Sequence, residues 1–175
     1  MEGANFEEVL YEGYGAGGVA MICEVLTDNR NRTAPEIRKI FEISGGKLGA
    51  VGSVAWMFDK KGLFMVSIAK VDEEKLLEIA LEAGADDVKQ DGDKFSVTCA
   101  ISAYRAVSEA LGKAGIEPEV QEITLIAKNT VDVDDPDTAR RILKLMEKLD
   151  DHDDVQNVVA NFNIPDAVMA QVAEE

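Results

Sequence analysis

The segment Asp28-Asn29-Arg30-Asn31-Arg32-Thr33 lies between an apolar run and a well-marked helix start, and the rest of the chain is placed relative to it. Thr33 and Glu36 have the spacing of a capping box, and Pro35 suits a first helical turn, whose N–H groups lack partners. We therefore expect a helix that begins at Thr33. It ends at Gly45-Gly46, because glycine readily takes the left-handed conformation of a helix end.

Apolar runs on both sides of this helix predict strands. Residues 19–26 form a buried strand that follows the glycine-rich segment 13–18. After the helix, residues 52–58 predict a second strand, in which Trp56 is a core residue. The polar cluster Asp59-Lys60-Lys61-Gly62 is typical of a turn and is expected to end that strand.

Residues 62–130 show the order strand, helix, strand, strand, helix, strand. Asp72 is a helix cap, and Asp91-Gly92 is the tight-turn signal between the two middle strands. This order predicts a ferredoxin-like βαββαβ domain.

The remaining residues supply the parts of a second sandwich. Residues 131–175 add a helix opened by Asp135 and Pro136, and then a strand from Val155 to Phe162. We therefore predict an α+β protein with two ferredoxin-like α/β sandwich domains, one inserted into the other. Residues 1–61 and 131–175 form the discontinuous domain, and residues 62–130 form the insertion.

The charge distribution is uneven. The chain has a net charge of -16, yet residues 28–61 carry seven bases and four acids, so this stretch is +3 and the remainder is -19. Phosphate backbones attract proteins through Lys and Arg, so the chain alone is expected to bind nucleic acid weakly, through this stretch. For Arg30 and Arg32 the alternative is ion pairing with nearby acids. The candidate contact residues are Arg30, Asn31, Arg32, Lys47, Lys60 and Lys61.

No pattern predicts catalysis, a cofactor or a metal site. Gly13, Gly15 and Gly18 fit G-x-G-x-x-G, but a strand follows them where a dinucleotide site needs a helix, so a glycine-rich hairpin or bulge is favoured. His152 is the single histidine, and its acidic neighbours are typical of an exposed turn, with weak divalent-cation binding as the alternative. Cys23 and Cys99 are expected to be free and buried.

The N-terminus lacks the pattern of a secretion signal, and no run has the length of a membrane span. A cytoplasmic protein without membrane contact is the expectation.

Several motifs together resemble those of the YebC/PmpR family of bacterial regulators, which is related to the mitochondrial translational activator of cytochrome c oxidase subunit I. Their order spans nearly the whole chain. They are Tyr11-Glu12-Gly13-Tyr14-Gly15, residues 28–33, Gly45-Gly46-Lys47-Leu48-Gly49, Gly52-Ser53-Val54-Ala55 and Asp153-Asp154-Val155-Gln156-Asn157-Val158.

The resemblance implies three domains, of which the first is helical, rich in lysine and opened by a G-H-S-x-W motif. This chain lacks that motif, so we expect a truncated form, a fragment or a short family member. The resemblance also implies a regulator of gene expression without catalytic residues. DNA-binding transcription regulation is the first expectation, and the alternatives are a ribosome-associated translation factor, which binds ribosomal RNA, and a small-molecule-sensing module.

Overall fold

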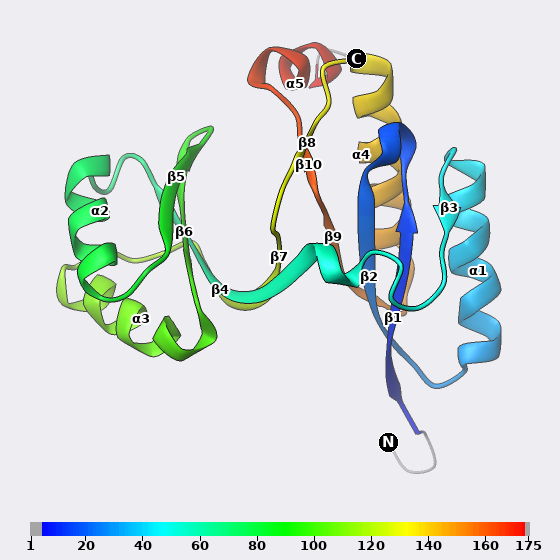
Figure 1. The fold of residues 1–175 in the computed structure, drawn as a ribbon, viewed down its shortest axis with the longest axis horizontal. Coiled ribbons are helices and arrows are strands. Elements are labelled where there is room, and N and C mark those ends of the chain that lie inside the picture. Colours follow the sequence, from blue (N-terminus) through cyan, green and yellow to red (C-terminus); the bar gives the residue numbers. More distant parts are fainter. Residues whose placement is uncertain (1–4, 174–175) are drawn as a thin grey trace. The chain divides into compact units, whose positions relative to one another are not determined.

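A computed structural model describes residues 5–173 of the chain (Figure 1). The chain divides into two compact units. The described residues up to Phe58 and from Ala127 onward form the first, here called the discontinuous unit, and residues 59–126 form the second, here called the inserted unit. Both are layered α/β structures, so the predicted α+β class is confirmed.

The discontinuous unit is built on a four-stranded antiparallel sheet. Its two central strands are a hairpin joined by the glycine-rich segment, with Gly13 opposite Met21, as the sequence predicted in place of a dinucleotide loop. In order across the sheet, the strands are β3 (Lys47–Leu48), β1 (Glu7–Tyr14), β2 (Ala20–Thr27) and β9 (Val155–Ala160).

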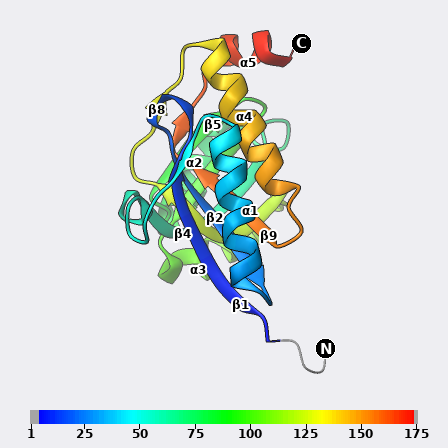
Figure 2. The ribbon, with the colours of Figure 1, turned by 90° about the vertical axis from the view of Figure 1, so that its right-hand side faces the viewer.

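Two helices pack against this sheet and against each other. α1 (Arg30–Ile43) and α4 (Pro136–Asp150) lie side by side (Figure 2). Their apolar faces meet the buried face of β2 in one core, which includes Met21, Phe41 and Leu145. We call α1 and α4 together the helix layer.

Three short elements complete the discontinuous unit. β8 (Val131–Asp132) and β10 (Phe162–Asn163) form a parallel pair, and α5 (Asp166–Ala173) packs against α4. These three elements were not predicted as separate structures, because two-residue strands and an eight-residue helix leave weak periodic signals in a sequence.

The start of α1 differs from the prediction. The helix begins at Arg30, one turn earlier than expected, and its N-cap is Asn29, whose side chain accepts a hydrogen bond from the Arg32 amide. Thr33 is buried inside the helix, and Pro35 is also inside. The capping-box reading was wrong because Asn29 takes the cap position, whereas the Thr33 hydroxyl is used in tertiary contacts.

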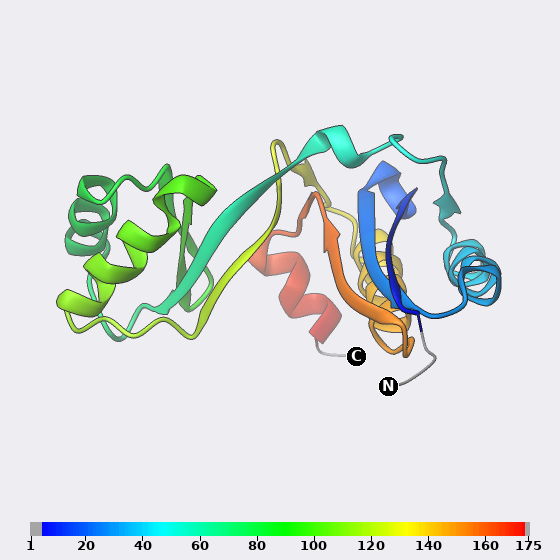
Figure 3. The same cartoon turned by 90° about the horizontal axis from the view of Figure 1, so that it is seen from below.

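The inserted unit has the predicted ferredoxin-like order. Its sheet runs β5-β6-β4-β7, and α2 and α3 cover one face (Figure 3). The elements are β4 (Phe58–Ser67), α2 (Glu73–Glu82), β5 (Asp87–Asp91), β6 (Lys94–Cys99), α3 (Tyr104–Lys113) and β7 (Val120–Ala127). The Asp72 cap and the turn at Gly92 are where the sequence placed them.

Two predictions around residue 58 were wrong. Asp59-Lys60-Lys61-Gly62 is no turn, because β4 runs through it without a break. Gly62 is there for close packing, since a Cβ atom would lie 2.5 Å from the Tyr104 ring and 2.8 Å from the Cys99 sulfur. Residues 52–57 form no strand but a loop and a 3₁₀ turn, Ala55–Met57, in which Trp56 is exposed and not a core residue.

Each unit has its own apolar core. Cys23 lies in the core of the discontinuous unit and Cys99 in that of the inserted unit, both free and fully buried, as predicted. Burial raises the pKa of the Cys23 thiol to about 12, with further increases from nearby Glu24 and Asp150. A thiol with so high a pKa is unreactive at neutral pH.

Candidate nucleic-acid interface

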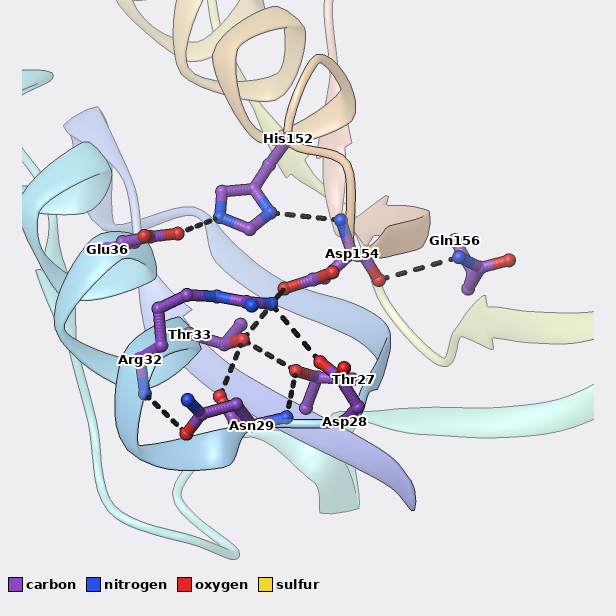
Figure 4. Close-up of polar contacts among 9 residues, drawn as sticks. All are labelled: Thr27, Asp28, Asn29, Arg32, Thr33, Glu36, His152, Asp154 and Gln156. Carbon is purple, nitrogen blue, oxygen red and sulfur yellow. Dashed lines mark hydrogen bonds and ion pairs between the residues drawn. The ribbon is translucent and has the colours of Figure 1, made fainter. Parts of the chain in front are cut away.

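A network of polar side chains fixes the N-terminal end of α1 (Figure 4). The Thr27 hydroxyl, at the end of β2, accepts a hydrogen bond from the Asn29 amide at 3.0 Å and lies 2.8 Å from the Thr33 hydroxyl. The Thr33 hydroxyl oxygen also lies 3.1 Å from the carbonyl oxygen of Asn29. The buried threonines therefore tie the first turn of the helix to the strand before it.

Asp154 joins this turn to the segment that precedes β9. Its Oδ2 atom accepts hydrogen bonds from Arg32 Nη2 at 2.7 Å and from the Thr33 hydroxyl at 2.8 Å. Its side chain is only 15% exposed. Burial raises the pKa of the carboxyl, but the hydrogen bonds from Thr33 and Arg32 outweigh it, so the net pKa of Asp154 is lowered.

His152 belongs to the same network. Its Nδ1 atom accepts a hydrogen bond from the Asp154 amide at 3.1 Å, so Nε2 carries the proton and faces Glu36 Oε2 of α1 at 2.6 Å. The turn between α4 and β9 is where the sequence placed it. Asp151 and Asp153 of this turn are exposed, as expected, but the imidazole is only 13% exposed and bridges α1 and the turn.

The predicted contact residues of this helix turn are partly engaged in ion pairs. Arg30 Nε lies 3.5 Å from Glu7 of β1, and Arg32 also lies 3.6 Å from Asp28. Both guanidinium side chains are nevertheless about half-exposed, and Asn31 is exposed. Arg30 and Arg32 thus form ion pairs with nearby acids, as the alternative interpretation of these two residues expected.

The other predicted residues lie elsewhere. Lys47 is exposed on β3, after the far end of α1. Lys60 and Lys61 belong to β4 of the inserted unit, where Lys61 pairs with Asp86 at 2.9 Å. Of the six candidates, the structure brings together only Arg30, Asn31 and Arg32, on the first turn of α1.

The helix layer carries basic residues from both helices, which were not predicted from the sequence to lie on one surface. Its two helices hold eight of the 18 bases of the chain but only five of its 34 acids. Within the described residues, five of these bases form no ion pair. We call them the helix-layer bases, and they are Arg38, Lys39, Arg141, Lys144 and Lys148.

Three of these bases surround a pocket. Arg141, Lys144 and Lys148 are spaced by three and four residues, so they share one face of α4. With Ile43, Ser44 and Gly45 at the end of α1, they line a pocket of about 280 Å³, here called the basic pocket.

The basic pocket has a further polar group. The Ser44 hydroxyl oxygen is buried and has no hydrogen-bond partner among the described residues. Gly45 has a φ of +80°, which lets the chain turn away at the helix end and leaves open space beside it. The C-terminal end of α1 carries a partial negative charge, which disfavours an anion, so attraction of an anion depends on the three bases of α4. The pocket therefore concentrates positive charge and suits a small anionic group such as a phosphate.

A second hollow lies along α1 itself. It measures about 240 Å³ and contains Arg38 and Lys39 beside Pro35 and Glu42. The helix layer thus presents two concave patches that contain bases. The spacing of the α4 bases can be read from the sequence, but α4 begins more than 90 residues after α1 ends, and no local pattern shows that the two helices are neighbours.

Other kinds of site find less support. Across residues 5–173, no three His, Cys, Asp or Glu side chains are arranged to hold a metal ion. In the same range, no helix combines the length and apolarity needed to cross a bilayer.

Comparison with known proteins gives a consistent result. The family model described as "TACO1/YebC second and third domain" matches residues 6–162. A probable transcriptional regulatory protein of Syntrophobacter fumaroxidans is 49% identical over 173 residues, which cover 99% of this chain and 70% of the relative. A protein of the same description from Desulfatibacillum aliphaticivorans is 51% identical over 171 residues, covering 98% and 69%.

A solved structure agrees with the sequence matches. The crystal structure of a conserved hypothetical protein from Aquifex aeolicus has a TM-score of 0.84 and 44% sequence identity, covering 95% of this chain and 68% of the other. Sequence and fold are therefore both similar over nearly the whole chain. The chain belongs to the TACO1/YebC family and contains the part that corresponds to the second and third domains of its members.

Proposed function

We propose that this protein is a non-enzymatic regulator of gene expression and that its discontinuous unit contacts nucleic-acid phosphates through the helix layer. The observation that carries the proposal is the set of five bases without ion pairs on two adjacent helices of a chain with net charge -16. On so acidic a protein, a basic surface is an expected location for a polyanion.

The geometry of the basic pocket supports the proposal. Arg141, Lys144 and Lys148 line one small volume together with Ser44. Arginine and lysine at a concave site are the usual ligands of backbone phosphates. The names of the relatives, probable transcriptional regulatory proteins, point to the same class of partner.

DNA and ribosomal RNA both present backbone phosphates, so the proposed contact through the helix layer applies to either nucleic acid. Transcription regulation requires duplex DNA as the partner, and a translation role requires the ribosome. Because the chain as a whole is acidic, binding is expected to be weak and steeply dependent on salt.

The test measures binding of fluorescently labelled duplex DNA and structured RNA by anisotropy at low salt, together with co-sedimentation with ribosomes. The variant Arg141→Gln/Lys144→Gln/Lys148→Gln should weaken the preferred complex about tenfold, which corresponds to about 1.4 kcal/mol. Unchanged affinity of this folded variant for every partner would contradict the proposal. Preference for DNA or for ribosomes decides between transcription and translation.

A further inference from the structure

A buried carboxylate holds a nine-residue loop in the discontinuous unit. Glu12 of β1 is 4% exposed, and its Oε2 atom accepts a hydrogen bond from the Gly52 amide at 2.6 Å. Its Oε1 atom accepts from the amides of Val54 at 3.0 Å and Ala55 at 2.6 Å. The carbonyl oxygen of Glu12 accepts from the Gly49 amide at 2.7 Å. We call residues 49–57 the Glu12-held loop.

The electrostatics of Glu12 agree with a fixed loop. Burial raises the pKa of the carboxyl, but the three backbone hydrogen bonds outweigh it and the net pKa is lowered. A charged carboxylate with three amide donors is a strong local constraint. The loop is therefore pre-organised.

This rigid loop presents apolar side chains to solvent. Val51 is 93% exposed, and Trp56, the single tryptophan of the chain, is 65% exposed. The indole Nε1 of Trp56 donates a hydrogen bond to the Ser53 carbonyl oxygen at 3.1 Å, which fixes the orientation of the ring. Leaving a large aromatic ring in water forgoes the free energy of its burial, so an exposed, fixed indole suggests a contact that covers it.

Charge indicates which partner fits the ring. From Ile43 to Phe58 the chain has no acidic residue, although acids make up 34 of its 175 residues. The one carboxylate inside the loop, that of Glu12, is buried and neutralised by amide groups. An anionic partner therefore meets no exposed acid of this stretch, and Lys47 at the start of it is exposed.

The size of the apolar surface favours a nucleobase over a folded protein. A stable protein interface covers about 800 Å² on each partner. Two apolar side chains on a narrow loop are too small for that, whereas one indole matches the face of one base. Bases of a duplex are already stacked on their neighbours, but unpaired bases are free to stack on an aromatic side chain.

We infer that Trp56 is a stacking platform for an unpaired base of a single-stranded nucleic acid, with Glu12 as the residue that positions the loop. The inference rests on the proposed nucleic-acid function and adds a strand type and a contact to it. The helix layer supplies attraction to phosphates, and Trp56 supplies selectivity for unpaired segments.

Because Trp56 is the only tryptophan, its own fluorescence reports the contact. Titration of the full chain with unlabelled oligo(dT) or oligo(U) at low salt should quench the emission, and a duplex of the same length should not. In parallel, anisotropy of labelled oligonucleotides gives the affinity. Trp56→Ala should lower single-strand affinity between about fivefold and 150-fold, as stacking contributes about 1–3 kcal/mol per base.

Three controls make the result specific. Trp56→Phe should retain most of the affinity, and Phe6→Ala should change nothing, although Phe6 is another exposed aromatic residue of the same unit. Glu12→Gln should keep the ring but reduce quenching and affinity, because the loop loses its anchor. Thermal unfolding of each variant checks that it is folded.

Each outcome supports or overturns the inference. Single-strand binding without quenching, equal quenching by duplex, or unchanged affinity of Trp56→Ala overturns it and leaves the proposed function intact. Absence of binding to any nucleic acid overturns both.

Discussion

The basic residues that lie near the two ends of α1 differ in their contacts. At the N-terminal end, Arg30 and Arg32 pair with carboxylates of β1 and of the segment before β9. At the C-terminal end, the three bases of the basic pocket form no ion pair within the described residues. Both groups lie on one helix layer, so the contrast separates bases that hold the fold from bases that remain available to a partner.

The difference follows from what each end must do. The first turn of α1 is joined to β2 and to the α4–β9 turn by polar contacts. The Asp154 carboxylate in that turn is only 15% exposed, so it requires hydrogen-bond donors. At the other end, α1 packs against α4 through apolar residues, and no base of the basic pocket belongs to that core. The same residue types therefore stabilise the fold at one end and present charge at the other.

The largest expected effect is on stability, from removal of the shared carboxylate. Asp154→Ala should lower the free energy of unfolding by about 2–3 kcal/mol, because Arg32 and Thr33 lose a charged acceptor. Its affinity for nucleic acid, measured below the unfolding transition, should change little. Asp153→Ala is the matched control, since this neighbouring carboxylate is exposed. Equal destabilisation by the two variants would contradict the assigned role of Asp154.

The next effect is on binding and concerns the basic pocket. Arg141→Gln/Lys144→Gln/Lys148→Gln should weaken nucleic-acid binding about tenfold while the free energy of unfolding changes by less than about 1 kcal/mol, as expected for exposed charges. Anisotropy and urea unfolding give the two quantities. The control Lys75→Gln/Lys89→Gln/Lys113→Gln removes the same charge from exposed positions of the inserted unit and should weaken binding less.

A pH series should separate the fold-holding carboxylates from the rest. The pKa values of Asp154 and Glu12 are lower in the folded protein than their usual values. Groups of this kind contribute stability that is complete above the unfolded pKa, about 4, and is lost as pH falls through the folded pKa. Urea unfolding between pH 6 and pH 3 should thus show a decline that is shallower in Asp154→Asn. An identical decline would exclude Asp154 as a contributor.

The smallest effect is expected for the paired arginines. Arg30→Ala/Arg32→Ala should lower nucleic-acid affinity by less than about threefold, because these side chains are occupied by Glu7, Asp28 and Asp154 and about half-exposed pairs contribute little. Anisotropy under the conditions used for the basic pocket provides the comparison. A loss larger than that of the pocket variant would mean that the first turn of α1 is the main contact.

Local signals predicted much of the fold. Asp72 and Asp135 were recognised as caps, and the turn at Gly92 and the hairpin around Gly13 were recognised as turns, because each depends on a few adjacent residues. Thr33 was misread because two caps were possible within five residues, and the choice depends on Asp154, which lies 121 positions away.

The candidate site was harder to predict for the same reason. The acidic neighbours of His152 predicted an exposed turn, but its partner Glu36 comes from another element, so the bridge could not be predicted from the local sequence. Trp56 was predicted to be a core residue because its neighbours in sequence are apolar. The Glu12 carboxylate, however, holds that segment as a loop at the surface. The basic pocket depends on contact between two helices that are distant in the chain.

The most direct test of the division between paired and unpaired bases is the salt dependence of binding. Each phosphate contact contributes about 0.9 to the slope of the logarithm of affinity against the logarithm of salt concentration. The slope should become shallower by up to about 3 in Arg141→Gln/Lys144→Gln/Lys148→Gln and stay close to that of the original protein in Arg30→Ala/Arg32→Ala. The reverse pattern, a slope changed by the arginine pair and unchanged by the pocket variant, would contradict the account.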